Sequence, residues 1–539
     1  MFEMVVRHAK FAVISVTMLA ASVSASGQSV SAGGTGQGQA PVQGQGQAQG
    51  AGAPAVKKLS VDEAVQMALE QNLSLQVERV NPQIQEMNIF TARSAWVPTL
   101  QSQFTGGNTT NPNYSRYGAS GATVQTDSVN WNVGAGQALR TGGRYDVSWG
   151  ANRQATNDLF QLTNPIRYSV LSGTFTQPFL RNFKIDAPRQ QLMISKKNRE
   201  MSDIQLRQTV LGTMRNVKNA YWDLAYQRAN LEVQQESLNL ANESLKNNQA
   251  RVRIGTMAPI DIIQAEAEVA SREESVIRAQ AAVDQSEDRF RTLVMDPATP
   301  GFWNTKFELS DKANFQAMAI DLDAAVRRAL DARTDLAQQR KGLEESDINL
   351  RYMKNQTMPD VNMVAKYSTI ATGGTTLIED GGSNDIGWGS VLHSLFRRDL
   401  PTWSLALNFS YPIGNSNAEA NLARARLQYG QAQTQLRLAE LNVTTQVRDT
   451  ARQVQANQKR VESTRKSREL QERKLEAEQK KFAAGMQTTY FVLQAQRDLV
   501  TARNAELQAI LDYTRSLIDF EMVQQAPVSG GSGGAIVVQ

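Results

Sequence analysis

Two long stretches of the chain place an aliphatic residue at nearly every seventh position. The first has Val210, Val217, Leu224, Leu231, Leu238, Leu245 and Val252, and the second has Val447, Val454, Val461, Arg468, Leu475 and Phe482. A seven-residue apolar repeat is typical of helices that pack as a coiled coil. The pattern predicts helices that begin near Ala187 and near Ala418. Each would contain about 65 residues and extend about 100 Å at 1.5 Å per residue.

A glycine interrupts the helical pattern after each of these stretches. Beyond Gly255 the apolar residues resume at spacings of three, four and seven, and they do so again beyond Gly485. A glycine between two helical runs indicates a helix C-terminus followed by a tight reversal. Each stretch therefore predicts a long helical hairpin.

The same pattern occurs twice along the chain. LSVDEAVQMALEQNLSL (Leu59–Leu75) matches IDLDAAVRRALDARTDL (Ile320–Leu336) at an offset of 261 residues, whereas the two reversals match at an offset of 230. Each copy of an internal repeat forms one structural unit. We therefore expect a first repeat over residues 59–297, a connecting segment over 298–319 and a second repeat over 320–525.

Between the helices of each copy, the side-chain period changes to two. In Trp403–Tyr411, for example, apolar side chains alternate with small or polar ones. The segments with this character are Thr99–Gly106, Val129–Leu139, Arg144–Arg153, Tyr168–Phe179, Val361–Thr369 and Trp403–Tyr411. Their lengths suit a transmembrane β-barrel, whose strands need about 9–11 residues. A set of strands packed on a water-soluble core is the alternative.

Prolines mark the joints between helices and strands. Pro98 and Pro359 precede a strand, whereas Pro178 and Pro412 end one, which suits a residue that interrupts both helices and ladders. The first pair of joints is 80 residues apart and the second is 53, so the first copy has 27 extra residues. That length fits one extra hairpin, with its turn at residues 138–144. Long polar loops are expected at the opposite end, over Gly107–Thr126, Ala155–Arg167 and Ala371–Arg398.

The two ends of the chain differ in composition from the repeats. A basic start, the short apolar stretch Phe11–Ala21 and the small residues Val23–Ala25 predict a signal peptide over residues 1–25. The apolar stretch is too short for a membrane anchor. Residues 26–58 are rich in Gly, Gln and Ala, and residues 526–539 form a Gly/Ser-rich tail. Neither segment can bury a core, so both are predicted to be disordered.

The overall composition excludes several classes of protein. The 539 residues include 57 Lys and Arg against 52 Asp and Glu, and this small, scattered basic excess does not indicate nucleic-acid binding. After residue 25 no apolar run approaches 18 residues, which argues against a transmembrane helix. The absence of cysteine excludes disulfides and a lipidated N-terminal cysteine.

The sequence offers little for an enzyme to use. Beyond the predicted signal peptide there is one histidine, His393, in a polar stretch beside Arg397 and Arg398, where a solvated loop residue is expected. No Walker-type loop, HExxH or CxxC motif occurs. We therefore expect no catalytic residues, no metal site and no cofactor.

Four doubled motifs complete the pattern. They are LSVDEAVQMALEQN with LDAAVRRALDAR, SAWVPTLQ with NQTMPDVN, QPFLRNF with YPIGNSN, and RVRIGTMAPIDIIQAEAEVA with KFAAGMQTTYFVLQAQRDLV. In this order and in duplicate they resemble the TolC-like outer-membrane efflux family over nearly all of Leu59–Gln525. The resemblance implies a mostly α fold with a β-barrel portion, in which long antiparallel coiled-coil hairpins join transmembrane strands.

The resemblance also implies a function and a set of partners. Three identical chains would share one barrel in the outer membrane of a Gram-negative bacterium, in contact with its lipid. Their helices would continue the barrel as a hollow tube across the periplasm. A periplasmic membrane-fusion adaptor and an inner-membrane transporter would complete the tripartite efflux or type I secretion system. The duct itself would pass substrates without changing them.

By the same resemblance, the two reversals form the periplasmic tip. The residues expected to meet the adaptor there are Gly255, Thr256, Met257, Gly485, Met486 and Gln487. The residues expected to line the closing aperture are Asp261, Gln264, Tyr490, Phe491 and Gln494.

The sequence departs from well-studied members of this family at the tip. The acidic ring residues of those members correspond to Phe491 and Gln494, and Gln487 stands where a basic partner of Asp261 would be. We therefore expect neither an aspartate ring nor that ionic latch. Apolar packing of Tyr490, Phe491 and Leu493 would be another way to close the aperture, although these residues fit an ordinary helix seam equally well.

The 27 extra residues leave two arrangements open. If the extra hairpin joins the wall, three chains make eighteen strands rather than twelve. If it lies outside the wall, it forms an extracellular extension, and we prefer this arrangement because the wall has to match twelve tube helices.

Two other classes of protein remain to be weighed. A periplasmic coiled-coil scaffold or adaptor accounts for the hairpins and the signal peptide, but not for strands at matching places in both copies. A secreted enzyme lacks plausible catalytic residues.

Overall fold

The computed structural model describes residues 56–114, 121–311, 315–377, 382–414 and 416–526. The predicted signal peptide, residues 26–55 and the tail from residue 527 lie outside the described residues. Residues 56–58, predicted to be disordered, instead belong to the strand β1 (Val56–Leu59), which pairs in parallel with β6 (Lys306–Leu309), and Ala526 of the predicted tail is buried.

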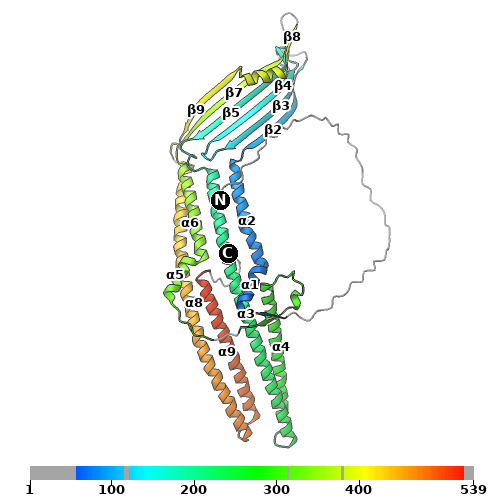
Figure 1. The fold of residues 1–539 in the computed structure, drawn as a ribbon, viewed down its shortest axis with the longest axis vertical. Helices are drawn as coiled ribbons and strands as arrows, with labels where there is room; N and C mark the ends of the chain where they lie inside the picture. The colour runs from blue at the N-terminus through cyan, green and yellow to red at the C-terminus, as the bar shows by residue number, and fades with distance from the viewer. Residues whose placement is uncertain (1–55, 115–120, 312–314, 378–381, 415, 527–539) are drawn as a thin grey trace, which may run out of the picture. The chain divides into compact units, whose positions relative to one another are not determined.

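Helices make up most of the described chain and occur as two matching sets (Figure 1). The first set is α1 (Val61–Gln71), α2 (Leu73–Arg93), α3 (Ala187–Arg253) and α4 (Ile260–Val294), and the second is α5 (Leu322–Ala332), α6 (Thr334–Gln356), α8 (Asn417–Ala483) and α9 (Thr489–Val523). Two short 3₁₀ helices are also present: η1 (Ser94–Trp96) in the first repeat and η2 (Phe302–Asn304) in the connecting segment. None of the described helices has an apolar stretch long enough to cross a membrane.

The two predicted long hairpins are confirmed. Helices α3 and α8 contain 67 residues each and begin where the sequence predicts. Their N-termini are capped alike, because the side chains of Asp186 and Ser416 accept hydrogen bonds from the backbone N–H of Arg189 and Glu419. The partner helices α4 and α9 contain 35 residues each.

The core is duplicated together with the helices. Val217 and Val447 are both fully buried at the same position of the two repeats, and so are Leu224 and Val454. The predicted seam holds for these residues but changes closer to the reversals. There, the buried positions of α3 are Gln234, Ser237, Ala241 and Asn248, and the predicted leucines are half-buried. A straight helix drifts about 20° per heptad against a strict seven-residue repeat, which accounts for this change.

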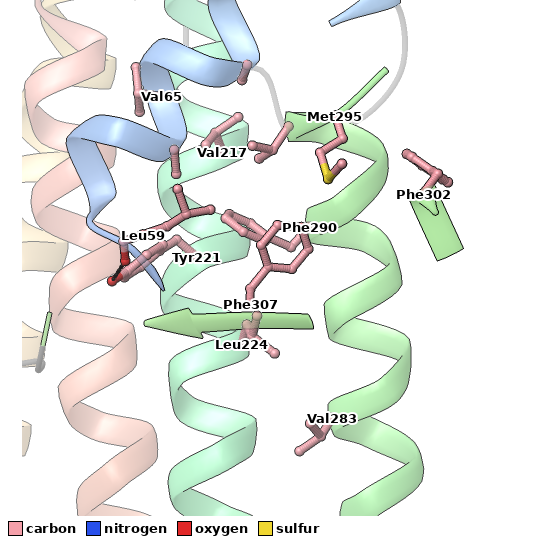
Figure 2. Packing of buried hydrophobic residues seen from close by; sticks show 13 residues of the cluster. Leu59, Val65, Val217, Tyr221, Leu224, Val283, Phe290, Met295, Phe302 and Phe307 are labelled. Carbon is pink, nitrogen blue, oxygen red and sulfur yellow. Dashed lines mark hydrogen bonds between the residues drawn. The ribbon is translucent and has the colours of Figure 1, made fainter. Parts of the chain in front are cut away.

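An aromatic cluster joins the short strands to the first hairpin (Figure 2). Phe290 of α4 lies edge-on to Tyr221 of α3 and to Phe307 of β6, with ring centroids 5.9 and 5.1 Å apart. The Tyr221 hydroxyl donates a hydrogen bond to the Leu59 carbonyl at 3.1 Å, and it accepts one from the Asp311 backbone N–H at 3.1 Å. This buried hydroxyl therefore fixes where both short strands lie on the helices.

The remaining strands form one antiparallel sheet (Figure 1). The strands are β2 (Thr99–Pro112), β3 (Thr123–Ala138), β4 (Arg144–Thr156), β5 (Thr163–Pro178), β7 (Asp360–Leu377), β8 (Ser383–Ile386) and β9 (Pro401–Ser410). The order is β2-β3-β4-β5-β7, with β8 and β9 both paired to the far edge of β7. Within the described residues, the outer edges of β2 and β9 are unpaired.

The register divides the sheet into an apolar and a polar face. The apolar face carries Leu100 and Phe104 of β2, Trp131 and Val133 of β3, Val147 and Trp149 of β4, Leu171 and Phe175 of β5, Met363 and Tyr367 of β7, and Leu405 and Leu407 of β9. The opposite face carries Gln101, Asn130, Asn132, Ser148, Asn152, Ser172, Thr174, Ser368, Ser404 and Asn408, among others. Leu100 and Phe409, near the open edges, are 78% and 70% exposed.

The extra hairpin of the first repeat belongs to this sheet. Strands β3 and β4 lie between β2 and β5, each paired with its neighbours over nearly its whole length. The preferred expectation placed this hairpin outside the wall as an extracellular extension, whereas the structure places it within the sheet, between β2 and β5. Trp131 and Val147 give the hairpin the same apolar face as the other strands, which makes a place within the sheet favourable.

The segment predicted as the loop Ala371–Arg398 is mostly ordered structure. Strand β7 continues to Leu377, β8 follows, and helix α7 spans Trp388–Arg397. Val391 and Leu395, one turn apart, are fully buried against the apolar face near Ala371. His393 therefore lies on a helix, where it is exposed, rather than in a loop. The other two predicted loops are also shortened, because β2, β3, β4 and β5 extend into them.

Candidate functional site at the helical reversals

The two reversals have the same backbone geometry. Gly255 and Gly485 follow α3 and α8 with φ of +76° and +73°, a left-handed conformation that glycine adopts without strain. In the first reversal, the N–H of Gly255 donates to Val252 and the N–H of Thr256 to Arg251. In the second, Gly485 and Met486 donate to Phe482 and Lys481 in the same way. These are two Schellman caps, which satisfy the last carbonyls of each helix.

The residues predicted to contact a partner are largely exposed around these caps. Met486 is 72% exposed, and both glycines and Thr256 are exposed, whereas Met257 and Gln487 are half-buried. The Gln487 side chain donates to Glu478 at 2.9 Å. A Cβ added at either glycine would meet no atom within 4 Å. Both reversals are therefore open to a partner.

The predicted aperture residues divide between two helices. Asp261 and Gln264 lie in the first two turns of α4, and Tyr490, Phe491 and Gln494 lie in the first two turns of α9. The Tyr490 and Phe491 rings contact each other edge-on with centroids 5.6 Å apart and are 58% and 47% exposed.

The neighbouring residues of α9 behave differently. Leu493 is buried, and Val492 packs with Leu475 and Leu499 in the seam between α8 and α9. Leu493 is therefore an ordinary buried helix residue. Tyr490 and Phe491 remain available on the surface of the chain.

An ionic contact between the two hairpins lies farther from the reversals and was not predicted. The Glu268 carboxylate of α4 accepts a hydrogen bond from Arg272 Nε at 2.7 Å and another from Arg497 Nε of α9 at 3.0 Å. Only 5% of the Glu268 side chain is exposed. One carboxylate thus binds two guanidinium groups, one from each hairpin.

The electrostatics of Glu268 favour its charged form. Burial alone would raise the pKa of this carboxyl, but the hydrogen bonds and charges of Arg497 and Arg272 outweigh burial and hold the pKa below its usual value. The same contact raises the pKa of Arg497. One feature of the sequence points to this site. An acidic residue occupies the same position in both copies, Glu268 in the first and Asp498 in the second.

Other contacts between the hairpins lie on both sides of Glu268. Nearer the reversals, the Arg251 guanidinium of α3 lies 4.6 Å from the ring centre of Phe482 in α8, a cation–π contact. Farther away, ion pairs join α9 to α3: Arg503 with Glu236, Arg515 with Asp223, and Arg215 with Asp519. Among the described residues, few polar contacts therefore join the reversals themselves. Of the residues that form ion pairs between the two hairpins, Glu268 has the most buried side chain.

The predicted proline joints lie where helices meet the sheet. Pro98 and Pro359 directly precede β2 and β7, Pro178 is the last residue of β5, and Pro412 follows β9. The joints of the two repeats contact each other. The Arg181 side chain, just after Pro178, forms an ion pair with Asp360, and the Phe179 N–H donates to the Val361 carbonyl at 2.9 Å.

The described residues contain no cluster of three or more His, Asp or Glu side chains that could bind a metal ion.

Comparisons with known proteins agree in family and fold. The profile of the outer membrane efflux protein family matches residues 146–294 and 325–521, more than half of the chain. The structure is similar to CusC (15% identity, 87% of this chain and 92% of CusC, TM-score 0.61) and to the CmeC outer membrane channel of Campylobacter jejuni (14%, 86% and 85%, 0.61). It is also similar to the outer membrane protein VceC of Vibrio cholerae (16%, 86% and 96%, 0.57). No curated protein matches the chain in a sequence comparison.

Proposed function

The chain belongs to the outer membrane efflux protein family, and we propose that it is the outer-membrane duct of a tripartite efflux or type I secretion system. The observation that carries this proposal is the sheet with one apolar face, one polar face and two open edges, joined to two long helical hairpins. A membrane-spanning sheet has to close, because unpaired backbone groups are too costly in lipid. Three copies of the chain would provide that closure.

The duct would be a passive part of a larger assembly. The exposed reversals would meet a periplasmic adaptor, and an inner-membrane transporter would supply the energy. The matching Schellman caps support this role, since they present the same backbone conformation twice in each chain. A trimer would therefore offer six similar sites at one end of the tube.

We further infer that two contacts between the hairpins hold the aperture closed. Glu268 binds Arg497 across the two hairpins, and Arg251 contacts Phe482 closer to the tip. Opening requires the hairpins to separate at this end, which would break both contacts. The exposed Tyr490 and Phe491 would then line the passage together with Gln494.

Membrane association separates the duct from a periplasmic scaffold. The duct should stay in the outer-membrane fraction after a high-salt wash, and after detergent extraction it should migrate as a trimer. Reconstituted into planar bilayers, it should give small, flickering currents. Release of the protein by salt, as a monomer that forms no channels, would favour the scaffold.

Gly485→Pro is expected to disrupt adaptor coupling without disrupting the trimer. Proline fixes φ near about −65° and lacks the N–H that donates to Phe482, so it cannot adopt the φ of +73° observed here. Gly485→Ala is the matched control, since it keeps the N–H and adds only about 1–2 kcal/mol of left-handed strain. Adaptor cross-linking and drug resistance should fall in the proline variant alone. Full resistance with Gly485→Pro would contradict the tip assignment.

Glu268→Gln is expected to increase channel opening. Loss of about 1–3 kcal/mol from the closed state corresponds to a roughly 5- to 150-fold shift toward the open state. The single-channel open probability measures this shift toward the open state. Glu274→Gln is the control, because Glu274 pairs with Arg278 on the surface of the same helix. Equal open probabilities in the two variants would contradict a role of Glu268 in closure.

Acidic pH should have the same effect as the Glu268 substitution. Because the pKa of Glu268 is lowered in the folded protein, its stabilising contribution is present at neutral pH and is lost as the pH falls through that lowered pKa. Opening should therefore rise in wild-type channels only at strongly acidic pH. The Glu268→Gln variant should lack this pH dependence.

A further inference from the structure

We propose that the extra hairpin β3–β4 is part of the membrane wall, so that three copies close a barrel of eighteen strands. In this barrel, β9 of each copy pairs with β2 of the next. The inference rests on the proposed function, since it takes the sheet to be the outer-membrane portion of a trimeric duct.

The apolar face continues across the middle of the extra hairpin, whereas Asp127 and Arg153 lie on the same face toward its far end. Phe104 of β2 lies opposite Trp131 of β3, and Val133 of β3 lies opposite Trp149 of β4. Trp149 in turn lies opposite Leu171 of β5. The rings of Trp131 and Trp149 also contact each other, with centroids 5.1 Å apart. A hairpin that extended into water would expose this apolar face to solvent, which is unfavourable.

Among the described residues, the hydrogen bonding separates β2 from β5. In a wall without the extra hairpin, β2 would pair with β5. Instead β3 occupies the inner edge of β2 from Thr99 to Pro112, and β4 occupies the edge of β5. Among the described residues, the outer edges of the long strands β2 and β9 have no paired strand, and neither has the outer edge of the four-residue strand β8. Further copies of this chain can pair with both edges, because β9 of one copy can pair with β2 of the next.

The strand directions allow these edges to pair. The strands β2, β3, β4, β5, β7 and β9 run alternately up and down, because each adjacent pair is antiparallel. An even number of alternating strands places β9 antiparallel to the β2 of the next copy. The wall then continues with the same pairing all the way round, as in other outer-membrane barrels. Three copies of six strands give eighteen.

The polar face suits a wide, water-filled interior. Among the described residues of these six strands, the charged residues on this face are Arg144, Asp146, Asp360 and Lys366. Two ion pairs neutralise most of this charge: Arg144 pairs with Asp146, and Asp360 pairs with Arg181. Most other positions carry Gln, Asn, Ser, Thr or Gly. Barrels of about 16–18 strands are wide enough to leave an aqueous channel. The barrel would therefore discriminate little by size or charge, which leaves selection to the helical end.

Cysteine labelling tests the wall directly, since the chain has no cysteine of its own. Val147→Cys places a thiol on the apolar face of β4, and Ser148→Cys places one on the polar face. In trimers reconstituted into liposomes, a membrane-impermeant maleimide should label Ser148→Cys at least tenfold faster than Val147→Cys. After denaturation both should react alike. Equal labelling in intact trimers would overturn the proposal.

A second pair of variants separates this inference from the proposed function. Leu407→Cys and Asn408→Cys occupy the two faces of β9, which belongs to the wall in either arrangement. If Leu407→Cys is protected while Val147→Cys is not, the extra hairpin lies outside the wall and only the eighteen-stranded barrel fails. If Leu407→Cys is labelled as fast as Asn408→Cys, the membrane assignment of the whole sheet fails.

The number of copies is tested by cross-linking the open edges. Gln101→Cys on β2 is combined in turn with Ala406→Cys, Asn408→Cys and Ser410→Cys on β9, all on the polar face. At least one combination should give disulfide-linked chains in a ladder that ends at the trimer. A ladder that ends at the dimer would mean twelve strands, and no cross-link in any combination would contradict the pairing of β9 with β2.

Discussion

Val454→Asp is expected to prevent assembly of the helical portion. Val454 of α8 is fully buried in a cluster that includes Ala325 of α5 and Tyr513 of α9. A carboxylate without a partner in this position has to be desolvated or protonated, which costs several kcal/mol. We expect the free energy of unfolding to fall by at least about 3 kcal/mol, in the range of mutations that bury an unpaired charge.

Two further variants calibrate that result. Gln455→Asp introduces the same carboxylate one residue away at an exposed position of α8 and should leave stability nearly unchanged. Leu231→Asp, in the first repeat, should have an intermediate effect because Leu231 is only half-buried. Thermal unfolding followed by circular dichroism, together with the yield of trimers in detergent, measures all three. A Val454→Asp protein as stable as Gln455→Asp would mean that the seven-residue seam is not the core.

The helical part of the fold could be predicted from local patterns. The seven-residue repeat and the two glycines depend on neighbouring residues only, and α3 and α8 begin and reverse where these patterns indicate. Duplication strengthened the prediction, because the same core positions recur in both repeats. The seam shifted near the reversals because a straight helix drifts against a strict seven-residue repeat.

The sheet and the ionic contact depend on long-range partners and were harder to predict. The alternation of apolar and polar side chains located strands β3 and β4, but it could not show which strands they pair with. Helix α7 was taken for a loop because it lies inside a long segment that is rich in glycine and polar residues, although Val391 and Leu395 are spaced for one helical face. Glu268 was missed because its partner Arg497 is 229 residues away.

Loss of a buried aromatic side chain should lower the free energy of unfolding more in the first repeat than in the second. Phe290 is fully buried between Tyr221 and Phe307 (Figure 2), whereas its counterpart Phe520 is buried without a described aromatic contact. Truncation of a buried phenylalanine to alanine costs about 3–5 kcal/mol, and an aromatic pair adds about 0.5–1.5 kcal/mol. Phe290→Ala should therefore destabilise the protein more than Phe520→Ala.

The position of Phe290 also predicts where that destabilisation appears first. Its ring contacts Phe307, whose strand β6 pairs with β1, so both short strands should loosen from α3 and α4. Hydrogen exchange should speed up at the Phe307 N–H, which donates to the Glu287 carboxylate at 2.9 Å, and at the ladder amides of the β1–β6 pair. Phe290→Leu should restore most of the protection because it refills the volume. If exchange in Phe290→Ala increased equally along α8 and α9, the aromatic cluster would not be a separate cooperative unit. Because the two repeats have separate buried clusters, we expect the effect to remain in the first.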